Sequence, residues 1–246
     1  MFFNEMHFGR LRAHNIVFNF EPWGVCMRRL LTASLVVLLL CAMASANVIT
    51  LTFEGLKDSE HILNFYNGGT GDLGSGPGPN FGISFGPDAL SLISGANGGN
   101  GNFSGSPTMP TIAFFLTGPG DVMNVAAGFT TGFSFFYSAV NNAGTVEVWS
   151  GPDGTGSLLA SLFLPVTPSG GAPECTYGAF CPWFPVGVTF AGTAQSVIFT
   201  GTANQIGFDN ITLGSETPTP GVPEPASMVL LGTGLLGIAR KIRRKA

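Results

Sequence analysis

Two carboxylates and one amide have the residue types and the setting of a metal site. Glu54 follows the apolar run that begins at Val48, and Asp209 and Asn210 lie in the last β-prone run of the chain. First and last strands commonly pair in two-sheet β domains, which would bring these groups together at one edge of a sheet. Carboxylate and carbonyl oxygens form the hard site that Ca²⁺ prefers. The alternative is that Asp209 and Asn210 only turn or cap the strand, while Glu54 is solvated.

Cys175 and Cys181 are the candidates for a disulfide, since the other two cysteines, Cys26 and Cys41, precede the part of the chain expected to be exported. In an exported chain, two cysteines this close, with Gly178 between them, most often close a surface loop. Metal binding is disfavoured, because no second cysteine pair or nearby histidine completes a site. So small a loop stabilises the fold by at most about 2–3 kcal/mol.

The same loop carries aromatic side chains that suit sugar binding. Tyr177 lies within it and Trp183 directly after it. Aromatic rings stack on the apolar faces of pyranoses, so both residues are candidate sugar contacts. The alternative is that these rings, with Phe180 and Phe184, tuck under the loop as a small satellite core.

Catalytic constellations are scarce between Asn47 and Gly221. His61 is the single histidine there, so a serine or cysteine hydrolase would have to be built on it. Neither G-x-S-x-G nor H-E-x-x-H occurs. A glycosidase needs just two carboxylates, but Asp58 and Glu60 are too close in sequence to face one substrate, and we interpret the carboxylates as surface charges. The sequence therefore predicts a protein that is not an enzyme, with a glycoside hydrolase as a distant alternative.

Charge is distributed unevenly along the chain. Nine of the ten Lys and Arg residues lie in Met1–Arg29 or Arg240–Lys245, so Asn47–Gly221 keeps Lys57 alone. Eleven carboxylates face that one cation, which gives this segment a net charge of −10, against −4 for the whole chain. Nucleic-acid binding is excluded, because phosphates are neutralised by Lys and Arg. Anionic polymers are poor partners too, unless divalent cations bridge them.

The acidic segment contains short β-prone runs separated by Gly, Pro and Asn, and no long stretch has a helical period. Val146 and Val148, for example, alternate with Thr145, Glu147 and Trp149. This pattern predicts an all-β domain, an antiparallel β-sandwich of jelly-roll type. The runs are Val48–Phe53, Gly82–Phe85, Thr111–Leu116, Gly128–Tyr137, Gly144–Trp149, Ser157–Leu164, Gly187–Phe190, Ser196–Thr200 and Gln205–Leu213.

Two glycine-rich segments, Asn67–Asn80 and Gly95–Ser106, have too few apolar side chains to pack as strands. They are predicted to be surface loops. Such loops are either solvated connectors or sites for a ligand or Ca²⁺. Connectors are favoured, because the periodic Asp residues of Ca²⁺ repeats are missing.

The C-terminus combines three features in a fixed order. Pro223-Glu224-Pro225 is extended and accessible, because neither proline can donate to a helix or ladder. Fourteen uncharged residues, Ala226–Ala239, then form a short transmembrane helix of about 21 Å, less than the roughly 30 Å hydrocarbon core. That length suits a transient anchor better than a permanent one. The cytoplasmic basic tail consists of Arg240, Lys241, Arg243, Arg244 and Lys245.

This arrangement over Val222–Ala246 resembles the PEP-CTERM sorting signal of Gram-negative bacteria. The resemblance implies that an exosortase-type membrane protease recognises Pro223, Glu224 and Pro225 during a transient inner-membrane insertion. It implies release to the cell surface or beyond, and a role among proteins that accompany exopolysaccharide in biofilms or flocs. The alternative is a plain C-terminal anchor.

Two further segments look like the first and last strands of many PEP-CTERM surface proteins: Val48–Gly55 (VITLTFEG) and Asn204–Gly214 (NQIGFDNITLG). This second resemblance implies a β-sandwich and no particular activity. Similar jelly-roll carbohydrate-binding modules carry a structural Ca²⁺ in the region where Glu54 and Asp209 would meet.

The N-terminus agrees with export. Met27-Arg28-Arg29, the apolar run Leu30–Met43 and Ala44-Ser45-Ala46 follow one another like the parts of a secretory signal peptide, which signal peptidase would cut between Ala46 and Asn47. Residues 1–26 contain acidic and aromatic side chains foreign to such a signal. We interpret Met27 as the true start and residues 1–26 as a mis-called extension; the alternative is an unusually long n-region.

These predictions divide the chain and suggest a role. We expect a structural protein of the cell surface or extracellular matrix. The alternative is a carbohydrate-binding module, Ca²⁺-dependent or not. The expected parts are residues 1–26 (extension), 27–46 (signal peptide), 47–214 (β-sandwich), 215–221 (stiff extended linker) and 222–246 (sorting signal).

Overall fold

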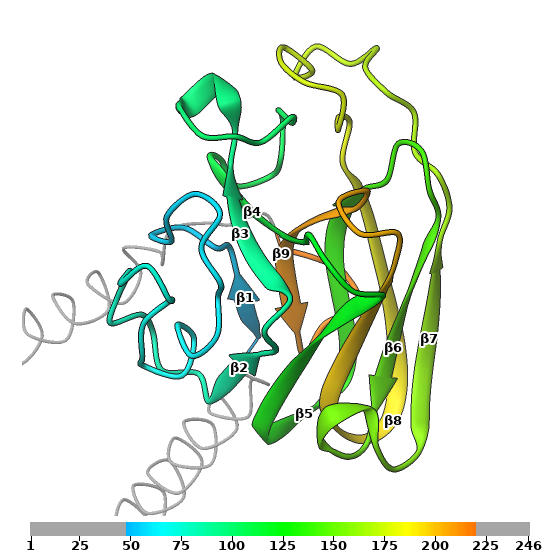
Figure 1. Cartoon of the computed structure of the whole chain (residues 1–246). Coiled ribbons are helices and arrows are strands. Elements are labelled where there is room, and N and C mark those ends of the chain that lie inside the picture. Colours follow the sequence, from blue (N-terminus) through cyan, green and yellow to red (C-terminus); the bar gives the residue numbers. More distant parts are fainter. Residues whose placement is uncertain (1–47, 220–246) are drawn as a thin grey trace, which may run out of the picture. The chain divides into compact units, whose positions relative to one another are not determined.

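The computed structural model describes residues 48–219, and within them the regular elements are nine strands and two short 3₁₀ turns (Figure 1). The predicted extension, signal peptide, short membrane helix and sorting signal all lie outside the described residues. In the described part, no helix has the length and apolar character needed to cross a membrane. The elements are β1 (Ile49–Leu51), β2 (Ile83–Phe85), β3 (Ala89–Ile93), η1 (Gly95–Asn97), β4 (Thr111–Phe115), β5 (Gly120–Ser138), β6 (Gly144–Trp149), η2 (Pro152–Gly154), β7 (Leu158–Leu164), β8 (Phe184–Gly201) and β9 (Gly207–Leu213).

All strand pairings are antiparallel and form one hydrogen-bonded network. The strand order is β3-β4-β9-β5-β8-β6-β7, with β1 paired to β9 and β2 paired to β5. The two longest strands, β5 and β8, run beside each other, and register shifts interrupt their pairing between Asn124 and Thr131. Bulges of this kind bend a sheet. Because of the bend, the two ends of the β5–β8 ribbon have different neighbours. At the end before the register shifts of β5, β2 pairs with β5 and β6 pairs with β8, whereas β9 pairs with β5 after these shifts.

Aromatic side chains fill the space between the two parts of the bent sheet. Phe199, near the end of β8, lies edge-on to Phe133 and Phe135 of β5, with ring centroids 6.2 and 6.1 Å apart. The Phe208 ring of β9 lies 4.9 Å from that of Phe199. Because β8 and β9 do not pair, this contact crosses the core. The strand pairings of the described residues and this core lie within residues 48–219, so this segment has a hydrophobic core of its own.

The predicted all-β, antiparallel fold is confirmed. Val146 and Val148 are fully buried, as their alternation predicts. Three strand predictions differ from the structure. Strand β5 begins at Gly120, well before the predicted run Gly128–Tyr137. Gly187–Phe190 and Ser196–Thr200 belong to a single strand, β8, because the polar stretch between them continues the ladder past a bulge. Strand β3 was not predicted, since its five residues lie between a proline-containing turn and a glycine-rich loop.

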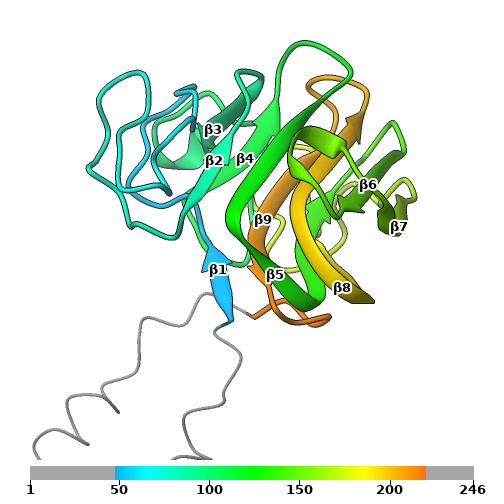
Figure 2. The ribbon, with the colours of Figure 1, turned by 90° about the horizontal axis from the view of Figure 1, so that it is seen from below.

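Residues 215–219 are part of the domain and not a free linker. The Asn210 amide donates to the carbonyl of Thr219 at 3.1 Å, and the Thr219 and Thr50 hydroxyls lie 2.6 Å apart. Beside Gly187 there is no room for a side chain, since a Cβ would lie 1.9 Å from the Glu216 carbonyl oxygen. The segment after β9 therefore returns along the sheet beside β1 (Figure 2). The predicted linker of 215–221 is wrong as far as Thr219.

Candidate functional site

An open pocket of about 480 Å³ lies where the loops after β3, β5, β7 and β8 meet. Its volume is in the range of small-molecule sites, about 300–1,000 Å³. Its walls combine amide side chains with apolar and aromatic ones, and none of its residues is charged. They are Ser59, Leu92, Asn100, Asn102, Phe103, Ile112, Phe114, Leu116, Asn141, Ala179, Phe180, Asn204, Gln205, Ile206 and Gly207.

One wall is the second glycine-rich loop, Gly95–Ser106, and Asp58 holds it in place. The Asp58 carboxylate accepts hydrogen bonds from the backbone of Ile93 at 2.8 Å and from the side-chain amide of Asn100 at 2.6 Å. Ser94 ties the two ends of the loop together by donating to the Phe103 carbonyl at 2.6 Å. The loop is thus anchored at its base, and it contributes Asn100 and Asn102 to the pocket.

The adjoining wall is the disulfide loop, closed by the Cys175–Cys181 bond. The backbone N–H groups of Ala179 and Phe180 each donate to the Asn102 carbonyl at 3.1 Å. Gly178 makes this approach possible: its φ is +72°, and a Cβ there would lie 2.3 Å from the Asn102 carbonyl carbon. The disulfide loop is therefore docked on the glycine-rich loop, and both contribute residues to the pocket.

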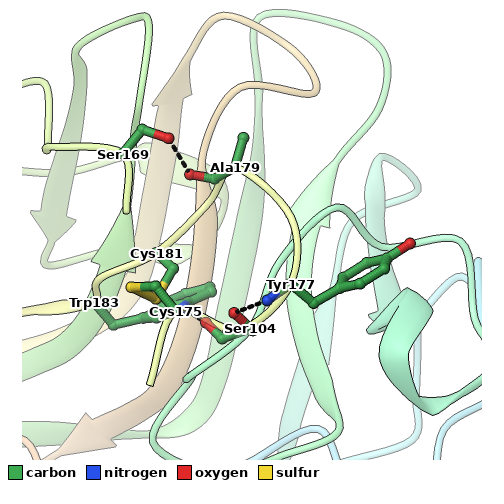
Figure 3. Close-up of a disulfide and its surroundings, with 7 residues drawn as sticks. All are labelled: Ser104, Ser169, Cys175, Tyr177, Ala179, Cys181 and Trp183. Carbon is green, nitrogen blue, oxygen red and sulfur yellow. Dashed lines mark hydrogen bonds between the residues drawn. A yellow bond between two sulfur atoms is a disulfide. The ribbon is translucent and has the colours of Figure 1, made fainter. Parts of the chain in front are cut away.

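Trp183 does not stack on a sugar. Its ring lies beneath the disulfide (Figure 3), only 9% exposed, with its centroid 6.0 Å from that of Phe103. Its indole N–H donates to the Ser104 carbonyl at 3.0 Å. The prediction of Trp183 as a sugar contact is wrong, and the satellite-core alternative describes it: Trp183, Phe103 and Ile112 form a small buried cluster.

Tyr177 has a different position. It is 45% exposed and points away from the disulfide (Figure 3). Its hydroxyl lies against Gly95, where an added Cβ would be 2.3 Å away. Tyr177 is not among the residues that line the pocket. Sugar contact by Tyr177 remains a prediction, at a position outside the pocket.

The chemistry of the pocket is that of amides beside apolar surface. Asn100, Asn102, Asn141 and Asn204 are exposed and can each donate and accept hydrogen bonds. Gln205 is half-buried, and its Oε1 accepts a long hydrogen bond of 3.4 Å from the Asn141 amide. Such a set matches hydroxyl groups, which also donate and accept, and it provides no charge to neutralise an ionic ligand.

The predicted Glu54–Asp209 pair lies elsewhere, inside the sheet. Strand β9 has β5 on one side, and on its other side β4 pairs with Phe208 while β1 pairs with residues from Ile211 onward. Asp209 and Asn210 therefore fall in a gap between β4 and β1. The first and last strands do pair, as predicted, but the site is interior and not at an edge of the sheet. Both Asp209 and Asn210 are fully buried, and Asn210 has a positive φ of 49°.

The electrostatics of this gap are unusual. Burial, and then the nearby charge of Glu54, raise the pKa of Asp209 well above its usual range, although backbone N–H groups of Thr108 and Asn210 donate to its carboxylate. Burial raises the pKa of Glu54 as well, against a hydrogen bond from Thr111 N–H at 2.9 Å. Two buried polar oxygens near Asp209 have no hydrogen-bond partner, Oδ1 of Asn210 and Oγ1 of Thr108.

These residues fit a Ca²⁺ ion in part. Two carboxylates, an amide oxygen and a hydroxyl are the oxygen ligands that Ca²⁺ takes. A bound cation would also compensate the buried charges. The described residues contain no cluster of three or more His, Cys, Asp or Glu side chains suited to a metal, so Ca²⁺ here would depend on amide, hydroxyl and carbonyl oxygens.

Two other predictions concern charged residues. His61 pairs with Asp72, its Nδ1 lying 2.6 Å from the carboxylate, in an exposed position outside the pocket. Glu60 is not a surface charge: it is fully buried and accepts hydrogen bonds from the backbone N–H groups of Lys57, Leu73 and Ser75.

Sequence reasoning missed the amides of the pocket. Asn100 and Asn102 were assigned to a connector, and Asn141, Asn204 and Gln205 were not considered. The available signal was the clustering of Asn in loops, at Asn97, Asn100 and Asn102 and again at Asn141 and Asn142. Composition alone does not say that these loops meet at one end of the sheet.

Comparison with known proteins identifies the end of the chain. The model of the PEP-CTERM protein-sorting motif matches residues 221–245, so the chain carries a C-terminal sorting signal of this type. Pro223, Glu224, Pro225 and the whole basic tail fall within the match. No curated protein matches the sequence.

Solved structures resemble the chain only distantly. The K2 cleaved adhesin domain of Lys-gingipain is 13% identical, with a TM-score of 0.43 over 69% of this chain and 98% of that one. A family 6 carbohydrate-binding module from Clostridium stercorarium is 16% identical, with a TM-score of 0.34 over 54% of this chain and 86% of that one. The corresponding module of Cellvibrio mixtus lichenase 5A is 14% identical, with a TM-score of 0.32 over 52% and 87%. These scores are too low to transfer a ligand or a function.

Proposed function

We propose that the chain is a non-catalytic, exported surface protein whose jelly-roll-type β-sandwich binds a neutral saccharide in the pocket beside the disulfide loop and the glycine-rich loop Gly95–Ser106. The pocket's composition carries this proposal: five amide side chains beside Phe103, Phe114 and Phe180, without a charged residue. A sugar ring offers hydroxyls to the amides and C–H faces to the rings. Uronic acids are disfavoured, because no cation lines the pocket and the described domain contains one Lys and no Arg.

Binding is best measured on residues 47–220 by calorimetry, with neutral oligosaccharides of gluco, xylo and galacto configuration and with a uronic-acid oligomer as the contrasting ligand. We expect saturable heat with at least one neutral oligomer and none with the acidic one. Gln205→Leu should weaken binding about tenfold or more, since it removes a half-buried hydrogen-bonding group from the pocket. Asn67→Ala, an exposed amide outside the pocket, is the matched control. If no neutral oligomer gives heat, the saccharide-binding proposal is contradicted and a purely structural role is favoured.

Trp183 provides a second readout. It contacts Phe103, which lines the pocket, and Trp149 is the other tryptophan of the domain. In the Trp149→Phe variant, the fluorescence of Trp183 should change on binding, although its ring never touches the sugar. If Gln205→Leu leaves this fluorescence change undiminished, the saccharide binds outside the pocket.

Export follows from the sorting motif under the same proposal. Signal peptidase would cut between Ala46 and Asn47, and an exosortase would recognise Pro223-Glu224-Pro225 during transient passage through the inner membrane. Since Thr219 is fixed to the domain, a short tether separates the domain from that motif. Replacing the three residues by alanine should leave uncut protein in the inner membrane. Unchanged maturation in cells would contradict this route.

A structural Ca²⁺ between Glu54 and Asp209 is a second proposal, favoured by the unpartnered Asn210 and Thr108 oxygens. The ion would supply charge compensation and hold β1, β4 and β9 together. Adding Ca²⁺ to chelator-treated domain should then raise Tm by several degrees, and Asp209→Asn should abolish the increase. Asp153→Asn, an exposed carboxylate, is the control. An equal rise in Tm in the wild type and Asp209→Asn would exclude this site.

A further inference from the structure

Two side-chain amides of the pocket have their oxygen engaged by the protein, which fixes the group that each offers to a ligand. The Asn102 Oδ1 accepts from the backbone N–H of Ala179 at 3.2 Å. The Gln205 Oε1 accepts from the side-chain amides of Asn141 and Asn142, at 3.4 and 3.3 Å. Both Asn102 and Gln205 line the pocket. Because these bonds use the oxygens, the NH₂ groups of the two residues are the groups left for a ligand, and they are donors.

Two other amides of the pocket are engaged in the opposite sense. Nδ2 of Asn100 donates to the Asp58 carboxylate at 2.6 Å, and Nδ2 of Asn141 donates to Gln205. These bonds do not use the Oδ1 atoms. Asn100 and Asn141 are exposed and line the pocket, so their oxygens are available as acceptors. Protein contacts therefore fix a set of two NH₂ donors and two carbonyl acceptors at the pocket.

A fixed set of donors and acceptors favours a ligand group whose own polarity is fixed. A hydroxyl rotates and both donates and accepts, so it is compatible with an amide in either orientation. An acetamido group cannot exchange these roles, because its carbonyl oxygen only accepts and its N–H only donates. Its carbonyl matches the NH₂ groups of Asn102 and Gln205, and its N–H matches the oxygen of Asn100 or Asn141.

The apolar part of the pocket suits the methyl group of an acetamido substituent. Phe103, Ile112 and Phe114 are buried there, and Leu92 and Phe180 are half-buried. A methyl group placed against these side chains is removed from water, and a sugar hydroxyl has no equivalent group to bury. Acetylation also keeps an amino sugar neutral, in agreement with a pocket that is lined by no charged residue.

We propose that the saccharide bound by the pocket contains an N-acetylated amino sugar, whose acetamido carbonyl accepts from Asn102 and Gln205. This inference rests on the proposed function, because it names the class of sugar that the same pocket takes. The hydroxyl oxygen of the unsubstituted sugar lies two bonds closer to the ring than the acetamido oxygen, and it brings no methyl group. It therefore replaces only part of the contacts, and Asn102 and Gln205 determine the specificity.

Calorimetry with matched pairs of oligosaccharides tests the proposal on residues 47–220, which contain the strand pairings of the described residues and have a core of their own. Each pair consists of an N-acetylated oligomer and the oligomer of the same length and linkage with a hydroxyl at that carbon, in gluco and in galacto configuration. We expect at least one acetylated oligomer to bind about tenfold or more tightly than its partner. Equal affinities, or a preference for the hydroxyl partner in both pairs, would overturn this inference and leave saccharide binding intact. No heat with any of the four would contradict the proposed function itself.

A deacetylated oligomer is the control for charge. Its ammonium groups are attracted to a domain with one Lys and eleven carboxylates between Asn47 and Gly221, whether or not they enter the pocket. That attraction should be largely lost in about 0.5 M salt, whereas binding of the acetylated oligomer should stay within about twofold. Loss of the acetylated oligomer at high salt would also overturn the inference.

Two isosteric variants test the donors. Gln205→Glu and Asn102→Asp keep the oxygen that the protein binds and replace the NH₂ group by a second oxygen. A hydroxyl can rotate and donate to that oxygen, but the acetamido carbonyl cannot, so the tenfold preference for the acetylated oligomer should fall to about one or below in each variant. Asn67→Asp, at an exposed position outside the pocket, adds the same charge and should keep the preference. Circular dichroism checks that the variants fold. A preference that survives in both pocket variants would contradict the assigned roles of Asn102 and Gln205.

Discussion

The two glycine-rich loops have similar compositions and opposite structures. Asn67–Asn80 closes around the Glu60 carboxylate, which is fully buried and accepts from the N–H groups of Leu73 and Ser75. Gly95–Ser106 is held at its base by Asp58 and opens toward the pocket. The carboxylates that organise the two loops are two residues apart in the chain. The first loop thus packs around a buried carboxylate, and the second forms one wall of the pocket.

The difference depends on where the polar side chains are directed. In the first loop the backbone is directed inward, and a Cβ at Gly71 would lie 2.5 Å from the Glu60 carboxylate oxygen. In the second loop the exposed amides of Asn100 and Asn102 remain at the pocket. Glycine content predicts a loop in both cases, but only the surroundings determine whether the loop closes on itself or faces a ligand.

The largest effect is expected from Glu60→Ala. The change would remove the carboxylate acceptor of three backbone N–H groups, of which that of Ser75 is buried and those of Lys57 and Leu73 are partly buried, and we expect a loss of about 3–5 kcal/mol in the free energy of unfolding. Hydrogen bonds outweigh burial and lower the pKa of Glu60, so its stabilising contribution is present above its ordinary pKa of 4.5 and is lost as the pH falls further. Denaturant unfolding at pH 7 measures the loss. Glu216→Ala, at an exposed position, is the control, and equal losses for the two variants would contradict the role of Glu60.

Gly178→Ala tests the second loop and should have the next largest effect. The new Cβ would meet the Asn102 backbone and push the disulfide loop away from the pocket. We expect a loss of about 1–3 kcal/mol in stability, and saccharide binding weakened by about tenfold or more. Gly170→Ala is a close control, because Gly170 has the same φ of +72° and nothing within 4 Å of its Cβ position. Gly170→Ala should lose stability because of the strained backbone, but it should bind the saccharide as the wild type does.

Sequence alone predicted the strands better than the loops, for a physical reason. Alternation of Val146 and Val148 with polar residues reports burial locally, so β6 could be assigned from its own residues. The pocket instead depends on contacts between residues far apart in the chain, such as Asn102 with Ala179. Trp183 illustrates the same limit: an aromatic residue next to a disulfide is typical of a sugar platform and of a small core alike, and the Ser104 carbonyl that binds its N–H is 79 residues away.

Asp121→Asn sharpens the contrast from a half-buried carboxylate on strand β5, outside both loops. Burial, and to a lesser degree the charge of Asp88, raise the pKa of Asp121 to about 6, and its Oδ2 has no hydrogen-bond partner. A raised pKa in the folded state means that its stabilising contribution is present below about pH 4 and is lost as the pH rises through 6. The Asn variant should therefore match the wild type at pH 4 and exceed its stability by roughly 1–2 kcal/mol at pH 7.5. Thermal unfolding at both pH values checks this, and a variant less stable at pH 7.5 would contradict it.

Tyr177→Ala should have the smallest effect and separates the outer surface of the disulfide loop from its pocket side. Ala179 and Phe180 of this loop line the pocket, whereas the Tyr177 ring is exposed and lies against Gly95. We expect saccharide affinity to stay within about twofold, because an exposed ring outside the pocket loses little on truncation. A tenfold loss measured by calorimetry would show instead that the ligand extends across η1 onto Tyr177. The second glycine-rich loop would then bind sugar along its whole outer face, and its contrast with the closed first loop would be greater than the pocket alone indicates.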